Sequence, residues 1–335
     1  MHKPTQRAIG RGERVLPGVW RLRLPLPWPG VPHCNAWAIG AGDGIVLVDT
    51  GMHGPGSLGH LERAMAQVSL RLESVRLIVC THAHSDHCGE APVIAERAGC
   101  EIWIHPRHEH FARAAADPGE ALARRVEIAR QSGVPEVPLQ KWAEARRGQG
   151  FGIKGELRAD RDLLPGVIVD SDLGGWEVIE TPGHAPSHVV LHQPERRLLV
   201  SGDHVLGRVS HFYEYGYTPD PVQEFLDSLD RVEALDVRLA MPGHGRPFTD
   251  LPGHVAANRS LVFERLEAVR TALGGGPLTA FELAPLVYGP LFVEATAQWL
   301  MNKLLCYLEH LERRDEVERV SALDGAPERW IILRS

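Results

Sequence analysis

The sequence has few cysteines and no long apolar run. Its cysteines are odd in number, form no Cys-x-x-Cys pair, and are Cys34, Cys80, Cys88, Cys100 and Cys306. Several lie inside apolar runs, where a cysteine is usually a small core residue, so a reduced, cytoplasmic compartment is the simplest expectation. No segment approaches the roughly 20 apolar residues of a membrane span. Residues 1–14 lack the apolar core of a signal peptide, and we expect none.

An excess of positive charge is also missing. The formal net charge is -7, which argues against broad attraction to nucleic acid or to an anionic membrane, because both depend on positive charge. With 44% hydrophobic and 24% charged residues, the composition is that of a soluble globular protein. A chain of 335 residues can bury a large core, and its length allows one large or two ordinary domains.

Histidines gather in one short stretch. Residues 81–89 read T-H-A-H-S-D-H-C-G and follow the apolar run 75–80, a pattern typical of a buried strand that ends in a loop. His82 and His84 can point the same way, as period-2 neighbours do, while Asp86 and His87 turn toward a second point nearby. Imidazole and carboxylate are ligands of zinc, with iron or manganese as alternatives. A solvated histidine-rich loop is disfavoured by the crowding of these four groups after a strand.

His-x-His-x-Asp-His after an apolar strand resembles the metal signature of the metallo-β-lactamase superfamily. The resemblance implies two metal ions. One would be held by His82, His84 and His184, the last from a Thr-Pro-Gly-His turn. The other would be held by Asp86, His87 and His244, with Asp203 bridging both. Asp49, at the end of a strand, is then expected to orient a ligand rather than to act as a turn former, and His188 to lie behind the ligands or to pack.

The resemblance also implies an α/β fold, the αββα sandwich, over residues 1–254. Helical patterns over about 106–150 predict an insertion that can roof an active site, and His108 and His110 near its start are expected at an exposed helix end. Residues 255–335 predict helices followed by a β-hairpin around the turn 324–327, which resembles the winged-helix domain of the lactamase-beta-2-like group. Several acidic residues and few basic ones lie in and after its long helix, so packing, dimerising or substrate capping is favoured over DNA binding.

In the chemistry that the resemblance implies, a metal-bridging hydroxide attacks an electrophilic carbonyl or phosphorus. Asp86 and Asp203 are the predicted catalytic residues: Asp86 accepts or delivers a proton, and Asp203 holds the two metals together. True β-lactamases of this fold lack the bridging aspartate, so Asp203 argues against β-lactam hydrolysis. The di-iron relatives that reduce oxygen carry Glu where this chain has His84, which disfavours a redox role.

Three functions remain open. The favoured one is a zinc hydrolase of a small-molecule thioester, ester or lactone. The alternative is a phosphodiesterase that cleaves single-stranded RNA, and a ligand-sensing DNA-binding regulator comes third. Tyr213 and Tyr215, in the aromatic stretch 211–217, are candidate substrate contacts, with a packed aromatic loop as their alternative. A homodimer is a further expectation.

Overall fold

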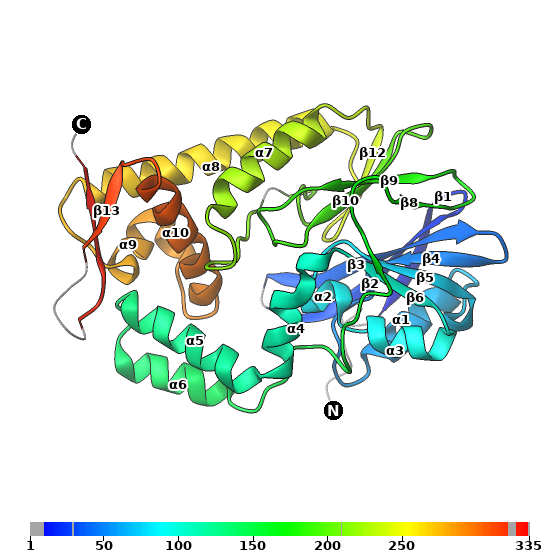
Figure 1. The fold of residues 1–335 in the computed structure, drawn as a ribbon, viewed down its shortest axis with the longest axis horizontal. Coiled ribbons are helices and arrows are strands. Elements are labelled where there is room, and N and C mark those ends of the chain that lie inside the picture. The colour runs from blue at the N-terminus through cyan, green and yellow to red at the C-terminus, as the bar shows by residue number, and fades with distance from the viewer. Residues whose placement is uncertain (1–9, 29, 209, 321–325, 334–335) are drawn as a thin grey trace.

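Two β-sheets pack face to face with helices on their outer sides (Figure 1). The computed structural model describes residues 10–28, 30–208, 210–320 and 326–333. The first sheet has the order β1-β2-β3-β4-β5-β6-β7: β1 (Arg11–Leu16), β2 (Val19–Trp28), β3 (Val31–Ala41), β4 (Gly44–Val48), β5 (Val75–Cys80), β6 (Glu101–Ile104) and β7 (Arg161–Asp162). Its strands are antiparallel from β1 to β4 and parallel from β4 to β7.

The second sheet has the order β12-β11-β10-β9-β8. Its strands are β8 (Ile168–Val169), β9 (Trp176–Glu180), β10 (Val189–Gln193), β11 (Leu198–Gly202) and β12 (Leu239–Pro242). Strand β10 is antiparallel to both β9 and β11, and β11 is parallel to β12. Strands β9, β11 and β12 therefore run in the same direction, and their carboxyl ends lie at one edge of the sheet.

The alternation of side chains along the strands places them in different cores. In β4, Val46 and Val48 join the core between the sheets, while Ile45 and Leu47 join the core beneath the outer helices. Both faces of β4 are thus buried, as expected for a central strand covered on each side. Helices α1 (Ser57–Ala66) and α3 (Ala91–Ala98) cover the first sheet, and α7 (Pro221–Glu233) and the start of α8 (Leu251–Leu273) cover the second. This is the predicted αββα sandwich.

The helical insertion lies between β6 and β7, as predicted. It contains the 3-10 turn η3 (Pro106–His108) and the helices α4 (Glu109–Ala116), α5 (Pro118–Gln131) and α6 (Glu136–Arg146). Its far end contacts the C-terminal part of the chain: the carbonyl of Ser132 accepts a hydrogen bond from the amide of Phe281 at 2.9 Å. Arg146 donates to the side chain of Gln298, also at 2.9 Å.

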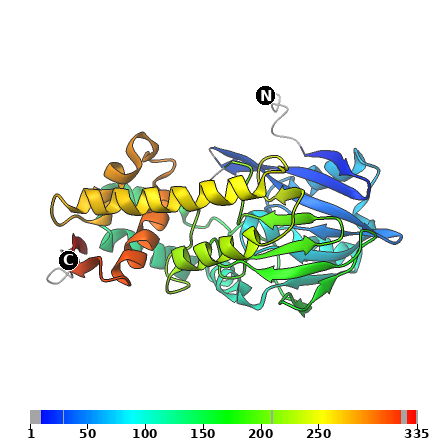
Figure 2. The ribbon, with the colours of Figure 1, turned by 90° about the horizontal axis from the view of Figure 1, so that it is seen from above.

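The C-terminal part contains three helices and a hairpin. Helix α8 is followed by α9 (Ala280–Tyr288), the 3-10 turn η4 (Gly289–Leu291), α10 (Ala297–Glu312) and the antiparallel strands β13 (Val317–Val320) and β14 (Arg329–Ile332). This order is the one expected of a winged helix, and that assignment stays a prediction. Residues 324–325 of the expected turn lie outside the described part. The expected boundary after residue 254 falls inside α8, which runs from the second sheet into the C-terminal part as one continuous helix (Figure 2).

Helix α8 starts at Leu251, before the region 255–335 in which the sequence predicts helices. Asp250 caps it by accepting a hydrogen bond from the amide of Gly253 at 3.0 Å. Pro252 fits the first turn of the helix, where a missing amide hydrogen costs no hydrogen bond. A proline and a glycine that indicate a loop in the sequence are therefore the start of a helix.

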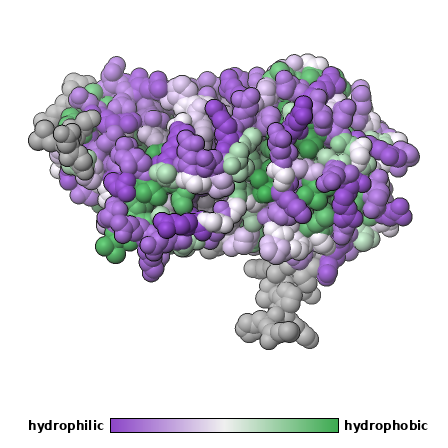
Figure 3. Space-filling model, turned by 60° about the horizontal axis from the view of Figure 1, so that its bottom comes forward, coloured by the Kyte–Doolittle hydropathy of each residue, from purple (hydrophilic) through white to green (hydrophobic). Residues whose placement is uncertain are grey.

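The surface is mostly hydrophilic on the face that Figure 3 shows, with apolar side chains in separate small areas. Within the described residues, no helix is both long and apolar enough to cross a membrane. The cysteines are free thiols; three belong to the core between the first sheet and its helices, and Cys306 belongs to the C-terminal core.

Candidate metal centre

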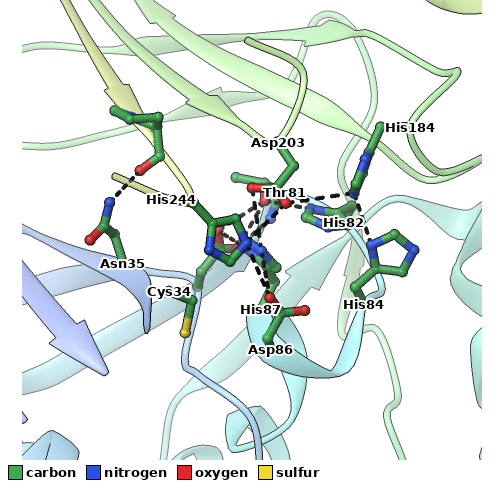
Figure 4. Close-up of polar contacts among 12 residues, drawn as sticks. Cys34, Asn35, Thr81, His82, His84, Asp86, His87, His184, Asp203 and His244 are labelled. Carbon is green, nitrogen blue, oxygen red and sulfur yellow. Dashed lines mark hydrogen bonds and ion pairs between the residues drawn. The ribbon is translucent and has the colours of Figure 1, made fainter. Parts of the chain in front are cut away.

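The candidate ligands lie just beyond the carboxyl ends of four strands. Strand β5 leads to His82 and His84, β9 to His184, β11 to Asp203 and β12 to His244. His84 is in extended conformation, and the short helix α2 (Ser85–Cys88) then turns the chain so that Asp86 and His87 face a different point. Because these strand ends meet at one edge between the two sheets, residues from distant parts of the sequence converge there (Figure 4).

The first group contains His82, His84 and His184. One nitrogen from each lies within 4.8 Å of the others, and Nδ1 of His84 is 2.9 Å from Nε2 of His184. His82 and His184 are buried, and His84 is partly exposed. Three histidines with one side open are the arrangement of a catalytic metal site, where the open position is left for water or substrate.

The second group contains Asp86, His87 and His244, whose ligand atoms also lie within 4.8 Å of one another. Nε2 of His244 is 3.2 Å from Oδ2 of Asp86. Asp203 lies between the two groups: its Oδ2 is 3.1 Å from Nε2 of His244 and 3.7 Å from Nε2 of His184. This is the position required of a carboxylate that touches both metal sites.

Most histidines of the site have one nitrogen held by the protein while the other faces the shared centre. The Nδ1 atoms of His87, His184 and His244 meet the carboxylate of Asp49 at 2.8 Å and the carbonyls of Phe212 at 3.2 Å and of His33 at 2.8 Å. Each of these Nε2 atoms faces the candidate ligands. Such hydrogen bonds select the tautomer and orientation of a histidine that binds a metal.

Several inward-facing atoms have no hydrogen-bond partner among the described residues. They are Nε2 of His82, Nε2 of His87 and Oδ1 of Asp203, all buried. Buried polar atoms are normally satisfied, and an unmet one costs about 1–3 kcal/mol. A divalent ion bound by these atoms would remove that cost, so the residues present fit the metal that the fold implies.

The charges of the site also fit a cation. Burial lowers the pKa of His82 well below its usual value, with His87 adding to the effect, and burial next to His84 lowers the pKa of His184 to about 3. These two imidazoles are therefore neutral, the form that binds metal. At His244, burial lowers the pKa, but Asp203 and Asp86 outweigh it and raise the pKa to about 10. The second group thus attracts positive charge.

Comparison with known proteins decides the family. The family model for the metallo-beta-lactamase superfamily matches residues 29–244. The chain belongs to the metallo-beta-lactamase superfamily. A probable metallo-hydrolase, YqjP of Bacillus subtilis strain 168, is 27% identical over 88% of this chain and 92% of its own length. An atrochrysone carboxyl ACP thioesterase of Aspergillus chevalieri is 24% identical over 98% of this chain and 89% of its own length.

Solved structures agree along nearly the whole chain. A metallo-beta-lactamase family protein from Thermus thermophilus superposes with a TM-score of 0.81 and 26% identity, over 96% of this chain and all (100%) of that protein. A beta-lactamase domain protein from Burkholderia ambifaria gives a TM-score of 0.77 and 25% identity over 96% and 94% of the two chains. The predictions of family, fold and enzyme class, a hydrolase of the metallo-β-lactamase fold, are confirmed.

Asp49 and His188 lie directly behind the candidate ligands. Oδ1 of Asp49 accepts from the amide of Thr81 at 2.8 Å, and Oδ2 is 2.8 Å from Nδ1 of His87. His188 accepts from the amide of Asp203 through Nε2 at 3.0 Å, so its Nδ1 carries the proton and donates to the hydroxyl of Thr181 at 2.8 Å. His188 therefore joins the two loops that hold His184 and Asp203.

The structure places Tyr213 and Tyr215, the expected substrate contacts, against the C-terminal core. Tyr213 is fully buried and packs edge-on against Phe225 and Tyr307 in the C-terminal core. Tyr215 is half-buried against the same core. Within 211–217, Tyr213 and Tyr215 face the C-terminal helices, whereas Phe212 and Glu214 face the metal site.

Neither Phe212 nor Glu214 stands out in the sequence. The Phe212 ring lies edge-on to His84 and His184, and its centroid is 5.7 Å from the His84 centroid and 5.8 Å from the His184 centroid. Glu214 is 3.4 Å from Nε2 of His84 and 2.9 Å from Nε2 of His110. The expectation of an exposed helix end is therefore wrong for His110, which is buried against Glu214, and His108 is half-exposed.

Proposed function

We propose that the chain binds two divalent metal ions, zinc in preference to iron or manganese, and hydrolyses an acyl substrate at a thioester, ester or lactone carbonyl. The observation that supports this most is the set of histidine nitrogens turned toward two adjacent points: His82, His87, His184 and His244 each have their other nitrogen held by a hydrogen bond from the protein. His82, His84 and His184 would hold one ion, and Asp86, His87 and His244 the other.

Two such ions, when bound, would supply Lewis acidity and lower the pKa of water toward about 7. The protein supplies position. Oδ2 of Asp203 lies between His184 and His244, so this carboxylate would keep the two ions at a fixed separation. Oδ2 of Asp86 faces His244 at 3.2 Å and is the nearby oxygen that would accept or return a proton. The Phe212 ring packs edge-on against His84 and His184 on one side of the histidine cluster.

Among acyl substrates, a thioester is favoured. The relative from Aspergillus chevalieri, which aligns with 98% of this chain, is named as a thioesterase acting on an acyl carrier protein. The net charge of -7 gives no support for an RNA substrate. Helix α10 does not present a free face to DNA, since it is buried on most sides: Leu300, Met301, Leu304, Leu305, Cys306, Tyr307, Leu308, His310 and Leu311. The C-terminal part is accordingly proposed to pack and to help shape the substrate site. The homodimer and the cytoplasmic location stay predictions.

The test combines metal analysis with a substrate panel. The purified protein is analysed for bound metals and assayed on acyl thioesters, lactones, a phosphodiester and single-stranded RNA. His84→Ala and Asp203→Ala are compared with His60→Ala, which removes a histidine from α1 on the outer side of the first sheet. We expect near two ions per chain, with acyl hydrolysis lost in the first two variants and kept in the third.

Other outcomes would change the proposal in defined ways. Metal-dependent RNA cleavage with inert acyl substrates would replace the acyl hydrolase by the nuclease. Absence of bound metal after growth and titration with zinc, together with absence of turnover, would refute the proposed function.

A further inference from the structure

The loop 212–217 lies between the candidate metal centre and the helical insertion. On one side, the Phe212 ring and the Glu214 carboxylate contact His84. On the other side, the insertion contacts the same loop through His110 and Arg124. His110 of α4 is 2.9 Å from Glu214, Arg124 of α5 donates to the carbonyl of Gly216 at 2.9 Å, and the Arg124 guanidinium lies over the Tyr217 ring, 5.1 Å from its centroid.

His84 differs from the other histidines of the site in which nitrogen faces the shared centre. Its Nδ1 lies 2.9 Å from Nε2 of His184, so Nε2 is the nitrogen on the far side of the ring. That Nε2 has no backbone carbonyl within hydrogen-bond distance among the described residues, and its nearest carboxylate oxygen is Oε1 of Glu214 at 3.4 Å. Glu214 therefore lies on the outer side of the His84 ring, as Asp49 lies on the outer side of the His87 ring, but at 3.4 Å rather than at the 2.8 Å of the hydrogen bond between Asp49 and His87.

We propose that Glu214 is a positioning residue for the metal held by His84, and that His110 links this carboxylate to the helical insertion. The inference rests on the metal site proposed above. Oε1 of Glu214 would accept the Nε2 proton of His84, which leaves Nδ1 as the ligand atom and keeps the ring oriented. Oε2 accepts from Nε2 of His110 at 2.9 Å. His110 Nδ1, in turn, is 2.7 Å from the carbonyl of Arg107.

The arrangement gives the insertion a role in metal binding. A carboxylate that contacts two imidazoles through different oxygens has little freedom to rotate, because turning it breaks both contacts. Removal of His110 would leave Glu214 free to turn away from His84, whereas removal of Glu214 would also leave His110 without a connection to the metal site. The two effects should therefore not add, as expected for residues in one network.

The experiment measures zinc affinity, which needs no substrate. Zn²⁺ is titrated into metal-free protein in competition with a chromophoric chelator for the wild type, Glu214→Gln, Glu214→Ala, His110→Ala and the Glu214→Ala/His110→Ala double variant. The matched control is Glu180→Ala, because Glu180 pairs with His105 at the start of the insertion at 2.8 Å and touches none of the candidate ligands. The absorption spectrum of the Co²⁺-loaded protein reports the geometry around the ion.

We expect Glu214→Ala to weaken the binding of one of the two ions by about 10–100-fold and to change the Co²⁺ absorption spectrum. Glu214→Gln should lose less zinc affinity than Glu214→Ala, since the glutamine amide oxygen can still accept a hydrogen bond from His84. The double variant should resemble Glu214→Ala, and Glu180→Ala should stay within about twofold of the wild type. Thermal unfolding of each variant checks that it is folded, and Glu214→Gln serves where Glu214→Ala does not fold.

Failure of this inference is distinguishable from failure of the proposed function. Wild-type zinc affinity and Co²⁺ spectrum in Glu214→Ala would overturn the role of Glu214 while leaving the metal site intact. An equal loss in Glu180→Ala would show a general effect of the insertion on folding and would also overturn it. A wild type that does not bind zinc, with His84→Ala unchanged from it, would refute the metal site itself.

Discussion

Replacement of Asp49 by Asn tests how the protein orients the other metal site. The Asp49 carboxylate is buried and receives three hydrogens: the amide of Thr81 at 2.8 Å, the Thr81 hydroxyl at 2.9 Å and Nδ1 of His87 at 2.8 Å. Asn has nearly the same shape, and it tolerates the left-handed backbone at this position, where φ is 61°. The substitution therefore changes an acceptor into a donor with little other disturbance.

The expected cost follows from the two carboxylate oxygens. Oδ1 receives the Thr81 amide and Oδ2 receives His87, so an amide in either orientation leaves one buried donor facing another donor. One unsatisfied buried donor costs about 1–3 kcal/mol, and each kcal/mol lowers the Tm of a large domain by roughly 2–4 °C. His87 loses the partner that fixes its Nδ1 proton, and loss of such a partner weakens metal binding by about 10–100-fold.

The assay is thermal unfolding and zinc titration of Asp49→Asn, with Asp172→Asn as control. Asp172 is exposed and accepts from the amide of Gly42 at 2.8 Å, so its replacement should change stability by no more than about 0.5 kcal/mol. The loss in Asp49→Asn should be larger with zinc than with a chelator, because weaker zinc binding also reduces the stabilisation that the bound ion gives to the folded state. Equal Tm and zinc affinity in Asp49→Asn and the wild type would refute this reasoning.

Three further predictions concern single residues. Burial next to Arg265 lowers the pKa of Lys303 to about 8 from the usual 10.5; the unfolded chain therefore binds this proton more tightly, and stability should rise as the pH increases from about 8 to 10.5. Lys303→Met should remove most of that rise. At pH 7 it should raise the free energy of unfolding by about 1 kcal/mol, a modest gain because the side chain is partly exposed. Denaturant unfolding at several pH values measures both effects. Tyr213→Phe should leave kcat/KM within about twofold of the wild type, because the ring is fully buried in the C-terminal core; a large rise in KM with unchanged stability would restore it as a substrate contact. Gly243→Ala should lower metal content and turnover, since a Cβ there would clash with Oδ1 of Asp203 and lie 2.6 Å from Cε1 of His87; full metal content by elemental analysis would contradict this.

The sandwich and the convergence of seven candidate ligands were predicted from the resemblance of the strand-end motifs to one superfamily, and those motifs are local patterns that the sequence displays. Buried strands of β-branched residues end at turns that contain His82, His184, Asp203 or His244, and the period of two along a strand decides which way its last residues point. The helical insertion was also located from its prolines, glycines and helical spacing.

Glu214, His110 and the start of α8 were missed for a common physical reason. The aromatic stretch 211–217 is irregular, so no period indicates which of its residues face the metal site and which face the C-terminal core. Glu214 and His110 are separated by 104 residues and meet because the insertion packs on that loop. Pro252 and Gly253 are compatible with both a loop and a helical first turn, and packing of α8 on the second sheet selects the helix.

The amino-acid order defines the chemistry available to this protein: imidazole and carboxylate side chains at the ends of buried strands, in an order that matches one metalloenzyme family. Tertiary structure alone decided which nitrogen of each histidine is held by the protein and which is left for a metal. It also decided that the Tyr213 side chain lies in the hydrophobic core and that Glu214 contacts His84. Local spacing orients neighbours along one strand or helix, whereas contacts between a loop, an insertion and a metal site depend on how whole elements pack.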